Sequence, residues 1–282
     1  MTGTLKLPDP TWFVGCGNMG RAILDGWRAG GLDLSPVTVI RPSGKPVEGA
    51  RVVASLRDAG PPPKLAILAF KPQKLDEIAP ELRQFLSAGT TLVSLLAGVE
   101  MTSLRQRFPG VGAIARATTN LPVAVRRGVT GLYSTDADTR TQQELNDLFS
   151  ALGFTMWMAD EQKLAVVGAL TGAGPAYVAR FVAALAKAGV DRGLSEEIAS
   201  TLTVETVLGT AWMAATTGEG MESIAKRVAS PKGTTQAGLD VLDRDAALDT
   251  LVAQTIDAAA RRGAELAEEA KSPSLAESPR LS

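Results

Sequence analysis

The chain has 282 residues, of which 45% are hydrophobic and 21% charged, so it can bury a sizeable core and global disorder is excluded. Lys and Arg number 29 and Asp and Glu number 30, and a net charge of −1 gives no overall attraction to nucleic acid or to an anionic membrane. The chain has no histidine and one cysteine, Cys16, which excludes His-containing catalytic triads, His metal sites, an internal disulfide and Cys-ligated clusters, so no metal site is expected.

The first part of the chain alternates short apolar runs with helical patterns. Arg21–Ala29 carries its apolar residues at helical spacing, and Gly30-Gly31 then ends the predicted helix. Strands that alternate with helices are typical of βαβ units, so we expect an α/β fold with a Rossmann-like, doubly wound, largely parallel sheet over residues 1–159. The predicted strands are Thr11–Val14, Val37–Ile40, Arg51–Val53, Leu65–Phe70, Thr91–Leu95, Ala113–Arg116, Val129–Tyr133 and Thr155–Met158.

The pattern changes after residue 160, because strand-like alternation is almost absent between residues 161 and 271. We expect an all-α C-terminal domain over residues 160–271, followed by a disordered tail over residues 272–282. Ser195 is placed to cap one of its helices. The predicted helices are Pro175–Val190, Ser195–Thr217, Gly233–Leu242 and Ala246–Glu269.

The helices of the C-terminal domain are rich in alanine, and some of their faces are too apolar for a lone bundle, which favours cover by a second subunit. The longest apolar runs, such as Leu164–Leu170, fall far short of the ~20 residues that span a bilayer. The N-terminus lacks the apolar segment of a signal peptide. We therefore expect a cytoplasmic protein that binds neither nucleic acid nor membrane. Its binding motifs, rather than its composition, imply a small-molecule substrate.

A glycine-rich segment with the pattern G-x-G-x-x-G follows the first predicted strand and opens the first predicted helix. In that context Gly15 permits a tight turn, Gly17 lets the backbone approach a pyrophosphate, and Gly20 allows close contact between helix and strand. The free N–H groups at the helix start then face the phosphates. This pattern predicts a dinucleotide site, and the alternative is an ordinary glycine-rich turn. The residues expected to bind the cofactor here are Gly15, Gly17, Asn18, Met19 and Gly20.

The end of the second predicted strand indicates which dinucleotide binds. NAD sites usually carry an acid there for the ribose 2′-OH, but this strand ends in Arg41 and no acid follows up to Lys45. Arg41 and Lys45 supply positive charge and Ser43 supplies a hydroxyl, which suits a 2′-phosphate. We expect NADPH as the preferred cofactor, with NADH as an alternative. The competing interpretation is a solvated basic loop.

Several further segments follow predicted strands or open predicted helices. Phe70-Lys71-Pro72 and Leu96-Ala97-Gly98-Val99 end strands at the sheet edge where such folds bind ligands, and Thr118–Pro122 is a polar loop after another apolar run. Gly172–Tyr177 starts a helix with a proline. Ala229–Thr235 enters a helix and combines hydroxyls with exposed N–H groups, a chemistry that can hold a carboxylate. Each segment has a plain alternative as a turn, a helix junction or a cap.

Together these motifs resemble the pyrroline-5-carboxylate reductase family, whose members make L-proline from Δ1-pyrroline-5-carboxylate. The resemblance implies a Rossmann domain and a C-terminal helical domain that forms an intertwined homodimer, with dimers often assembled into larger rings. It implies an NAD(P)H-dependent reduction of a C=N bond, the last step of proline biosynthesis. The motifs that carry it are Gly15–Ile23, Phe70–Pro72, Ala97–Val99, Thr119–Pro122, Gly172–Tyr177 and Ser230–Thr235, and the last two are the most specific.

The resemblance also implies which residues form the site. Those bordering the cofactor are Ala69, Phe70, Lys71, Pro72 and Ala97, with Asn120 near the nicotinamide. Those holding the substrate carboxylate are Ser230 and the backbone of Gly233, Thr234 and Thr235, whose N–H groups we expect to be free of intrahelical partners. The Thr235 hydroxyl meets the ring nitrogen, which makes Thr235 the expected catalytic residue.

The chain departs from the family at Lys232, where glycine is common, and this lysine either reaches the carboxylate or points to solvent. The absence of histidine suits the reaction, because a protonated imine accepts a hydride without a strong base and the protein mainly positions the reactants. A β-hydroxyacid dehydrogenase shares the glycine loop, but its Lys–Asn pair is missing after Gly174. A non-catalytic NADP-binding regulatory module is a further alternative, although it has no need of the polar 230–235 loop.

Overall fold

The computed structural model describes residues 5–271, and the predicted disordered tail, residues 272–282, lies outside the described residues. Residue contacts divide the chain into two compact units, one of Met1–Ala173 with Ala259–Ser282 and the other of Gly174–Ala258. The first unit holds the sheet, and the second is helical wherever it has regular structure.

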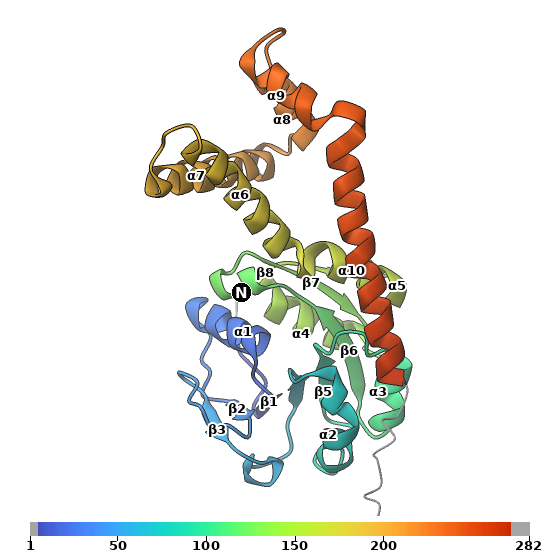
Figure 1. The fold of residues 1–282 in the computed structure, drawn as a ribbon. Coiled ribbons are helices and arrows are strands. Elements are labelled where there is room, and N and C mark those ends of the chain that lie inside the picture. The colour runs from blue at the N-terminus through green and yellow to red at the C-terminus, as the bar shows by residue number, and fades with distance from the viewer. Residues whose placement is uncertain (1–4, 272–282) are drawn as a thin grey trace, which may run out of the picture. The chain divides into compact units, whose positions relative to one another are not determined.

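The first unit is built on a twisted eight-stranded sheet (Figure 1). Its strands lie in the order β3-β2-β1-β4-β5-β6-β7-β8, in which β6 and β7 are antiparallel and every other neighbouring pair is parallel. The order from β3 to β6 is that of a dinucleotide-binding Rossmann sheet, so the predicted largely parallel sheet is confirmed. The strands are β1 (Thr11–Val14), β2 (Val37–Ile40), β3 (Arg51–Val53), β4 (Leu65–Leu68), β5 (Thr91–Ser94), β6 (Ala113–Thr118), β7 (Gly128–Tyr133) and β8 (Gly153–Trp157).

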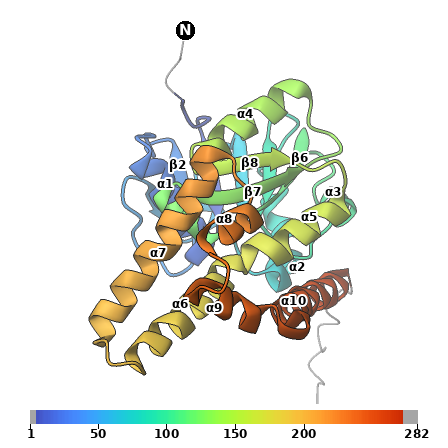
Figure 2. The same cartoon turned by 90° about the horizontal axis from the view of Figure 1, so that it is seen from above.

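Helices cover both faces of the sheet, as Figure 2 shows with α4 on one side and α2 on the other. Alternate residues of β1 explain why, because Phe13 enters one apolar core and Trp12 enters a second. The Phe13 core also takes Trp27, whose indole nitrogen donates a hydrogen bond to the Leu148 carbonyl at 2.8 Å. The helices on the Phe13 side are α1 (Asn18–Ala29) and α4 (Thr139–Ser150), and those on the Trp12 side are α2 (Leu75–Leu82) and α3 (Met101–Arg107).

Three short 3₁₀ helices, η1 (Leu56–Asp58), η2 (Pro72–Lys74) and η3 (Leu121–Val125), connect the longer elements. η3 lies directly against α1, since a Cβ at Gly26 would stand 2.1 Å from the Val123 carbonyl oxygen. Only glycine at this position lets the two segments approach so closely. The loop that carries Asn120 is thereby fixed against the helix that opens at the glycine loop.

The helix after the sheet belongs to the first unit. α5 (Glu161–Val167) buries Leu164 against β7, where a Cβ at Gly131 would lie 3.0 Å from the Leu164 Cδ1. The π-helical turn η4 (Gly168–Gly172) follows it. The sequence pattern ends the first domain at residue 159 because the strands end there, whereas contacts end the first unit at Ala173 because α5 packs on the sheet.

The second unit consists of helices in the described part of the chain. Ser195 caps α7 as expected, accepting a hydrogen bond from the Ile198 N–H at 3.3 Å. No strand occurs among the described residues after Trp157, so the prediction of an all-α C-terminal region is confirmed. The helices are α6 (Gly174–Val190), α7 (Glu196–Thr217), α8 (Met221–Val228), α9 (Thr234–Leu242) and α10 (Ala247–Lys271), with the short η5 (Arg244–Ala246) before α10; the sequence analysis did not predict α8.

The second unit by itself has almost no core. Ala199, Thr203 and Ile224 are its buried residues, while fifteen of its large apolar side chains are exposed, including Phe181 and Trp212 at 51% and 55%. Among the described residues, one helical stretch, Glu161–Val190, is long and apolar enough to span a membrane by length and composition. The expectation that every apolar run is too short is therefore wrong for this stretch, because alanine and glycine extend it between the larger side chains.

Candidate active site

The glycine loop turns sharply between β1 and α1. Gly15 has φ = +81°, and its N–H donates to the Ile40 carbonyl at 2.8 Å. A Cβ at Gly15 would lie 2.8 Å from the Phe70 Cβ and 2.9 Å from the Ala69 carbonyl oxygen. Both the left-handed backbone and this contact require glycine. The structure thus brings Ala69 and Phe70 against the loop, as a cofactor-bordering segment requires.

The rest of the loop leaves room for an anion. A Cβ at Gly17 would meet nothing within 4 Å, whereas one at Gly20 would lie 3.3 Å from the Ala69 Cβ. The first helical hydrogen bond runs from the Arg21 N–H to the Gly17 carbonyl at 2.9 Å, so the N–H groups that precede it in α1 have no helical acceptor. Unpartnered N–H groups beside open space at a helix start fit a pyrophosphate.

Arg41 lies at the carboxyl end of β2, beside the glycine loop. Its Nε donates to the Ser43 hydroxyl at 2.9 Å. Burial raises the pKa of the Cys16 thiol above its usual value, and the guanidinium groups of Arg41 and Arg21 act in the opposite direction. Among the described residues, no carboxylate lies within ion-pair distance of Arg41, so its charge is available to a ligand phosphate.

Two further predicted residues flank this edge of the sheet. Lys71 is exposed and directly precedes η2, whose first residue is Pro72. The Lys74 N–H donates to the Lys71 carbonyl at 2.9 Å, which fixes the turn after β4. The lysine side chain is thus presented at the carboxyl end of the sheet, and its contact with a cofactor stays a prediction.

A cleft of about 2030 Å³ opens at the carboxyl ends of β5 and β6. It brings together Met19 from the first turn of α1, Ala97 of the loop after β5, and Thr118 and Thr119 at the end of β6. Ligands of doubly wound folds bind at such an edge. The other predicted cofactor residues do not line this cleft, and their contacts with a cofactor stay predictions.

Asn120 is 6% exposed and both ends of its side chain are engaged. Its amide donates to the Thr171 carbonyl at 3.0 Å, and its oxygen accepts from the Val129 N–H at 2.9 Å. These bonds tie the loop after β6 to β7 and to the end of η4. Asn120 therefore stabilises the loop after β6, and its place near the nicotinamide stays a prediction.

The 230–235 loop belongs to the second unit and enters α9. Gly233 precedes the helix and carries no side chain that could cap it, and a Cβ there would lie 2.3 Å from the Ser230 hydroxyl oxygen. The Gly233 N–H donates to the Ser230 carbonyl at 2.9 Å, so it has no partner within the helix, as expected, but it is engaged within the loop. The N–H groups of Thr234 and Thr235 precede the first helical bond, which Ala237 donates to Gly233 at 3.1 Å. They remain suited to a carboxylate.

Lys232 has a φ of +61°, in the left-handed region that favours glycine. Glycine, which the resemblance implies at this position, would adopt this backbone without strain. The lysine side chain is exposed, and no ion pair involves it among the described residues.

We predict that Lys232→Gly raises the free energy of unfolding by up to about 1 kcal/mol, because glycine relieves the left-handed strain while adding some freedom to the unfolded chain. Its KM for the substrate should stay within about twofold of wild type if the lysine points to solvent. Urea unfolding and steady-state kinetics measure the two effects. Lys232→Ala is the matched control, since it removes the charge and keeps the strained Cβ. A raised KM in both variants would instead show that the lysine holds the substrate.

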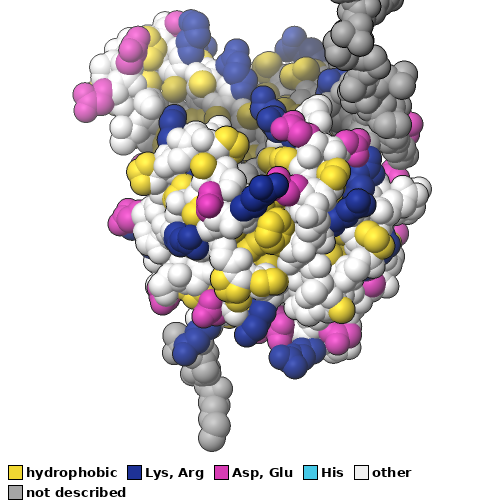
Figure 3. Space-filling model, turned by 90° about the horizontal axis from the view of Figure 1, so that it is seen from below, with side chains coloured by type: hydrophobic (Ala, Val, Ile, Leu, Met, Phe, Trp, Pro, Cys, Tyr) yellow, Lys and Arg dark blue, Asp and Glu magenta, His cyan; other side chains and the backbone are white. Residues whose placement is uncertain are grey.

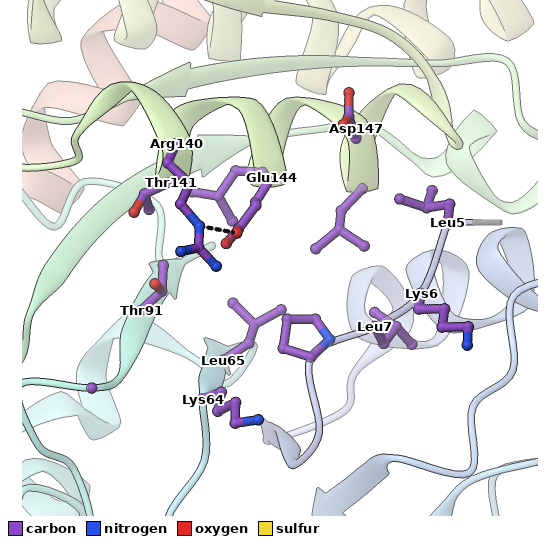
Figure 4. Close-up of a pocket in the computed structure, with 14 residues that line it drawn as sticks. Leu5, Lys6, Leu7, Lys64, Leu65, Thr91, Arg140, Thr141, Glu144 and Asp147 are labelled. Atoms are coloured by element: carbon purple, nitrogen blue, oxygen red, sulfur yellow. Dashed lines mark hydrogen bonds and ion pairs between the residues drawn. The ribbon is translucent and has the colours of Figure 1, made fainter. Parts of the chain in front are cut away.

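A second hollow, of about 430 Å³, lies at the opposite edge of the sheet, where β4 and β5 begin (Figure 4). Leu65 and Thr91 line it, and Arg140 and Glu144 pair across 2.9 Å beside it. None of the predicted site residues lies there.

The surface of the protein carries mixed charge. The face in Figure 3 shows basic and acidic side chains interspersed, in keeping with the near-zero net charge. No group of three or more potential metal-ligating side chains occurs within the described residues.

The N-terminal and C-terminal parts of the chain match two different family models. Residues 12–98 match a family model described as NADP oxidoreductase, coenzyme F420-dependent, and residues 161–266 match one described as pyrroline-5-carboxylate reductase dimerisation. A pyrroline-5-carboxylate reductase of Pseudomonas aeruginosa is 33% identical over 267 residues, which are 91% of this chain and 96% of that protein. The chain belongs to the pyrroline-5-carboxylate reductase family.

Solved structures agree with this family. A pyrroline-5-carboxylate reductase from Coxiella burnetii has a TM-score of 0.82 and 30% identity, covering 92% of this chain and 99% of that one. The Plasmodium falciparum pyrroline carboxylate reductase, solved with NADP bound, has a TM-score of 0.84 and 22% identity, covering 94% and 100%, and shows the shared fold. The predicted family and fold class are confirmed.

One polar cluster in the cleft, Arg116 with Glu161, was not predicted from the sequence. Arg116 is 8% exposed at the carboxyl end of β6, and its Nη1 lies 2.6 Å from the Glu161 Oε1. The signal was a single arginine inside an otherwise apolar strand, which is unusual unless its charge is paired. Its partner stands 45 residues away and no local pattern indicates it.

Proposed function

We propose that the protein catalyses the NADPH-dependent reduction of Δ1-pyrroline-5-carboxylate to L-proline. The observation that carries this proposal is the similarity to reductases of that name over nine-tenths of the chain. The glycine loop supports it, because its open Gly17 and unpartnered N–H groups fit a dinucleotide pyrophosphate. The family membership argues against both a β-hydroxyacid dehydrogenase and a non-catalytic module.

The cofactor would supply a hydride to the C=N carbon, which is chemistry that the protein need not provide. The chain's residues bind and orient. The loop from Gly15 to Gly20 holds the pyrophosphate, and Arg41 with Ser43 holds the 2′-phosphate that distinguishes NADPH from NADH. Ala69 to Pro72 and Ala97 border the cofactor. Arg41 has no carboxylate partner in the described chain, which supports its assignment to a phosphate.

The substrate is held by the loop that enters α9. Ser230 and the N–H groups of Thr234 and Thr235 bind the carboxylate, and the Gly233 N–H stabilises the turn that presents them. The Thr235 hydroxyl hydrogen-bonds the ring nitrogen. The nitrogen is protonated before reduction and keeps its proton in the product, so no strong base is needed and the absence of histidine is no obstacle.

The dimerisation model over residues 161–266 supports a homodimer formed through the helical region. We predict that the protein sediments as a dimer or a larger assembly of dimers at micromolar concentration, because the second unit exposes side chains such as Phe181, Leu202 and Trp212 and needs a partner to bury them. The same burial accounts for the apolar helix Glu161–Val190 without a membrane. Sedimentation velocity measures the mass, and a well-behaved folded monomer would contradict the prediction.

We further propose that the dimers assemble into rings and that the protein is cytoplasmic. The single cysteine, Cys16, suits a reducing compartment. To test the function, NADPH consumption is followed with pyrroline-5-carboxylate beside other cyclic imines and 2-oxo acids. The proposal expects consumption with pyrroline-5-carboxylate and none with 2-oxo acids. Consumption with a 2-oxo acid alone would support a hydroxyacid dehydrogenase instead.

A further inference from the structure

The ion pair between Arg116 and Glu161 stands in the cleft at the carboxyl end of the sheet. Arg116 lies in β6 and is nearly buried, and burying a guanidinium is unfavourable unless a counter-charge is at hand. Glu161 supplies that charge through its Oε1 at 2.6 Å. The pair therefore fixes the Glu161 carboxylate in one place.

The same Glu161 oxygen also contacts the start of α3. It accepts a hydrogen bond from the Met101 N–H at 2.7 Å, and Met101 is the first residue of α3. Glu100, which precedes the helix, makes no side-chain cap of its own. Glu161 thus caps α3 from a distant element, and a carboxylate there interacts favourably with the helix N-terminus.

α3 directly continues the loop after β5, which contains Ala97 and a left-handed Gly98 with φ = +76°. One end of the loop is fixed to the sheet, because the Leu95 N–H donates to the Leu68 carbonyl at 3.0 Å. The other end is fixed by the bond from Met101 to Glu161. Ala97, Gly98 and Glu161 all line the cleft.

We propose that Glu161 is a positioning residue that holds the 97–100 loop in its cofactor-bordering place, with Arg116 holding Glu161 in turn. This inference rests on the proposed function, which assigns Ala97 to the cofactor. Loss of the Glu161 contact leaves this end of the loop held only by the packing of Val99 and Met101 in the core, so cofactor binding weakens and the hydride donor is less well aligned.

A merely structural role would give a different result, and the neighbouring Asp160 provides the matched control. Asp160 caps α5 by accepting from the Lys163 N–H at 2.7 Å. Asp160→Ala removes a helix cap one residue away but leaves the contact to α3 intact. Any general weakening of α5 therefore appears in Asp160→Ala. Glu161 variants lose both the loop anchor and the counter-charge of Arg116, so Arg116→Met, which removes the guanidinium and keeps Glu161, reports the effect of the broken ion pair alone.

The experiment titrates the full-length protein with NADPH in the absence of imine and measures melting temperature, kcat and KM alongside. Glu161→Ala should raise the NADPH Kd about tenfold, and Glu161→Gln, which keeps an oxygen acceptor for the Met101 N–H, should raise it about threefold. Asp160→Ala should leave the NADPH Kd within about twofold while lowering the melting temperature. In Glu161→Ala the imine KM should change less than the NADPH Kd.

Equal NADPH affinities in Glu161→Ala and Asp160→Ala would overturn the proposal, whether both match wild type or both are weakened. If Glu161→Ala does not fold, the comparison between Glu161→Gln and Asp160→Ala decides in the same way. The binding titration needs no imine, so its result stands even if wild-type protein binds NADPH and fails to reduce pyrroline-5-carboxylate, an outcome that would refute the proposed function alone.

Discussion

Replacing Thr235 with valine should lower kcat by roughly tenfold to hundredfold, because about 1–3 kcal/mol is lost with a hydrogen bond to a charged or buried group. Thr235 is half-buried in the first turn of α9, and no hydrogen bond of its hydroxyl occurs among the described residues. The hydroxyl is therefore free to contact the ring nitrogen, whose charge and geometry change during reduction. Valine keeps the shape and removes only this hydroxyl. Steady-state kinetics with saturating NADPH and pyrroline-5-carboxylate measure the effect.

Ser230→Ala is the control for the same loop. The carboxylate is present in substrate and product alike, so a contact to it is largely uniform binding and its loss should appear mainly in KM. The two variants thus separate a contact made to the reacting nitrogen from one made to the carboxylate. If Thr235→Val kept wild-type kcat and kcat/KM, the loop would be a carboxylate cradle or a helix cap and Thr235 would have no catalytic role.

Arg41→Asp should raise the KM for NADPH at least about tenfold more than the KM for NADH, because charge-assisted hydrogen bonds to the 2′-phosphate are lost and an unfavourable charge replaces them. Arg41 hydrogen-bonds Ser43 at 2.9 Å, so the two side chains present a cation and a hydroxyl together. Kinetics with each cofactor at saturating pyrroline-5-carboxylate give the ratio.

Arg21→Ala is the matched control for the charge at this edge. Arg21 also acts on the Cys16 thiol, but its Nε pairs with the Asp25 carboxylate at 3.1 Å. Its removal should affect the two cofactors nearly equally. Equal effects of Arg41→Asp on NADPH and NADH would reject Arg41 as the residue that recognises the phosphate.

The strands were predictable because parallel strands buried on both faces are continuous apolar runs bounded by turn residues. β1, β2 and β3 match their predicted bounds, whereas β4 ends at Leu68 and the pattern extends it to Phe70. The difference arises beyond Leu68, where Ala69 still donates to the Val14 carbonyl at 2.8 Å but Ala69 and Phe70 lie against Gly15 instead of continuing the strand. α5 was not separated from the helical region, since its packing on Gly131 is a tertiary contact that no local pattern contains.

The residues of the candidate site could be predicted where they belong to one short stretch of sequence. The glycine loop and the 230–235 loop are local motifs. Gly15 accounts for the turn of the first, whereas the left-handed residue of the second is Lys232. The hydrogen bond from the Gly233 N–H to the Ser230 carbonyl could not be predicted, because the sequence does not determine the conformation of this turn. The pairing of Arg116 with Glu161 depends on the fold bringing β6 to the start of α5.

The most direct test of the function is a product balance. Purified protein, NADPH and pyrroline-5-carboxylate are incubated together, and the NADPH consumed is compared with the L-proline formed. We expect one L-proline for each NADPH, with much lower turnover in Thr235→Val and no turnover when a 2-oxo acid replaces the imine. Protein that binds NADPH and forms dimers, yet produces no L-proline from pyrroline-5-carboxylate, would contradict it.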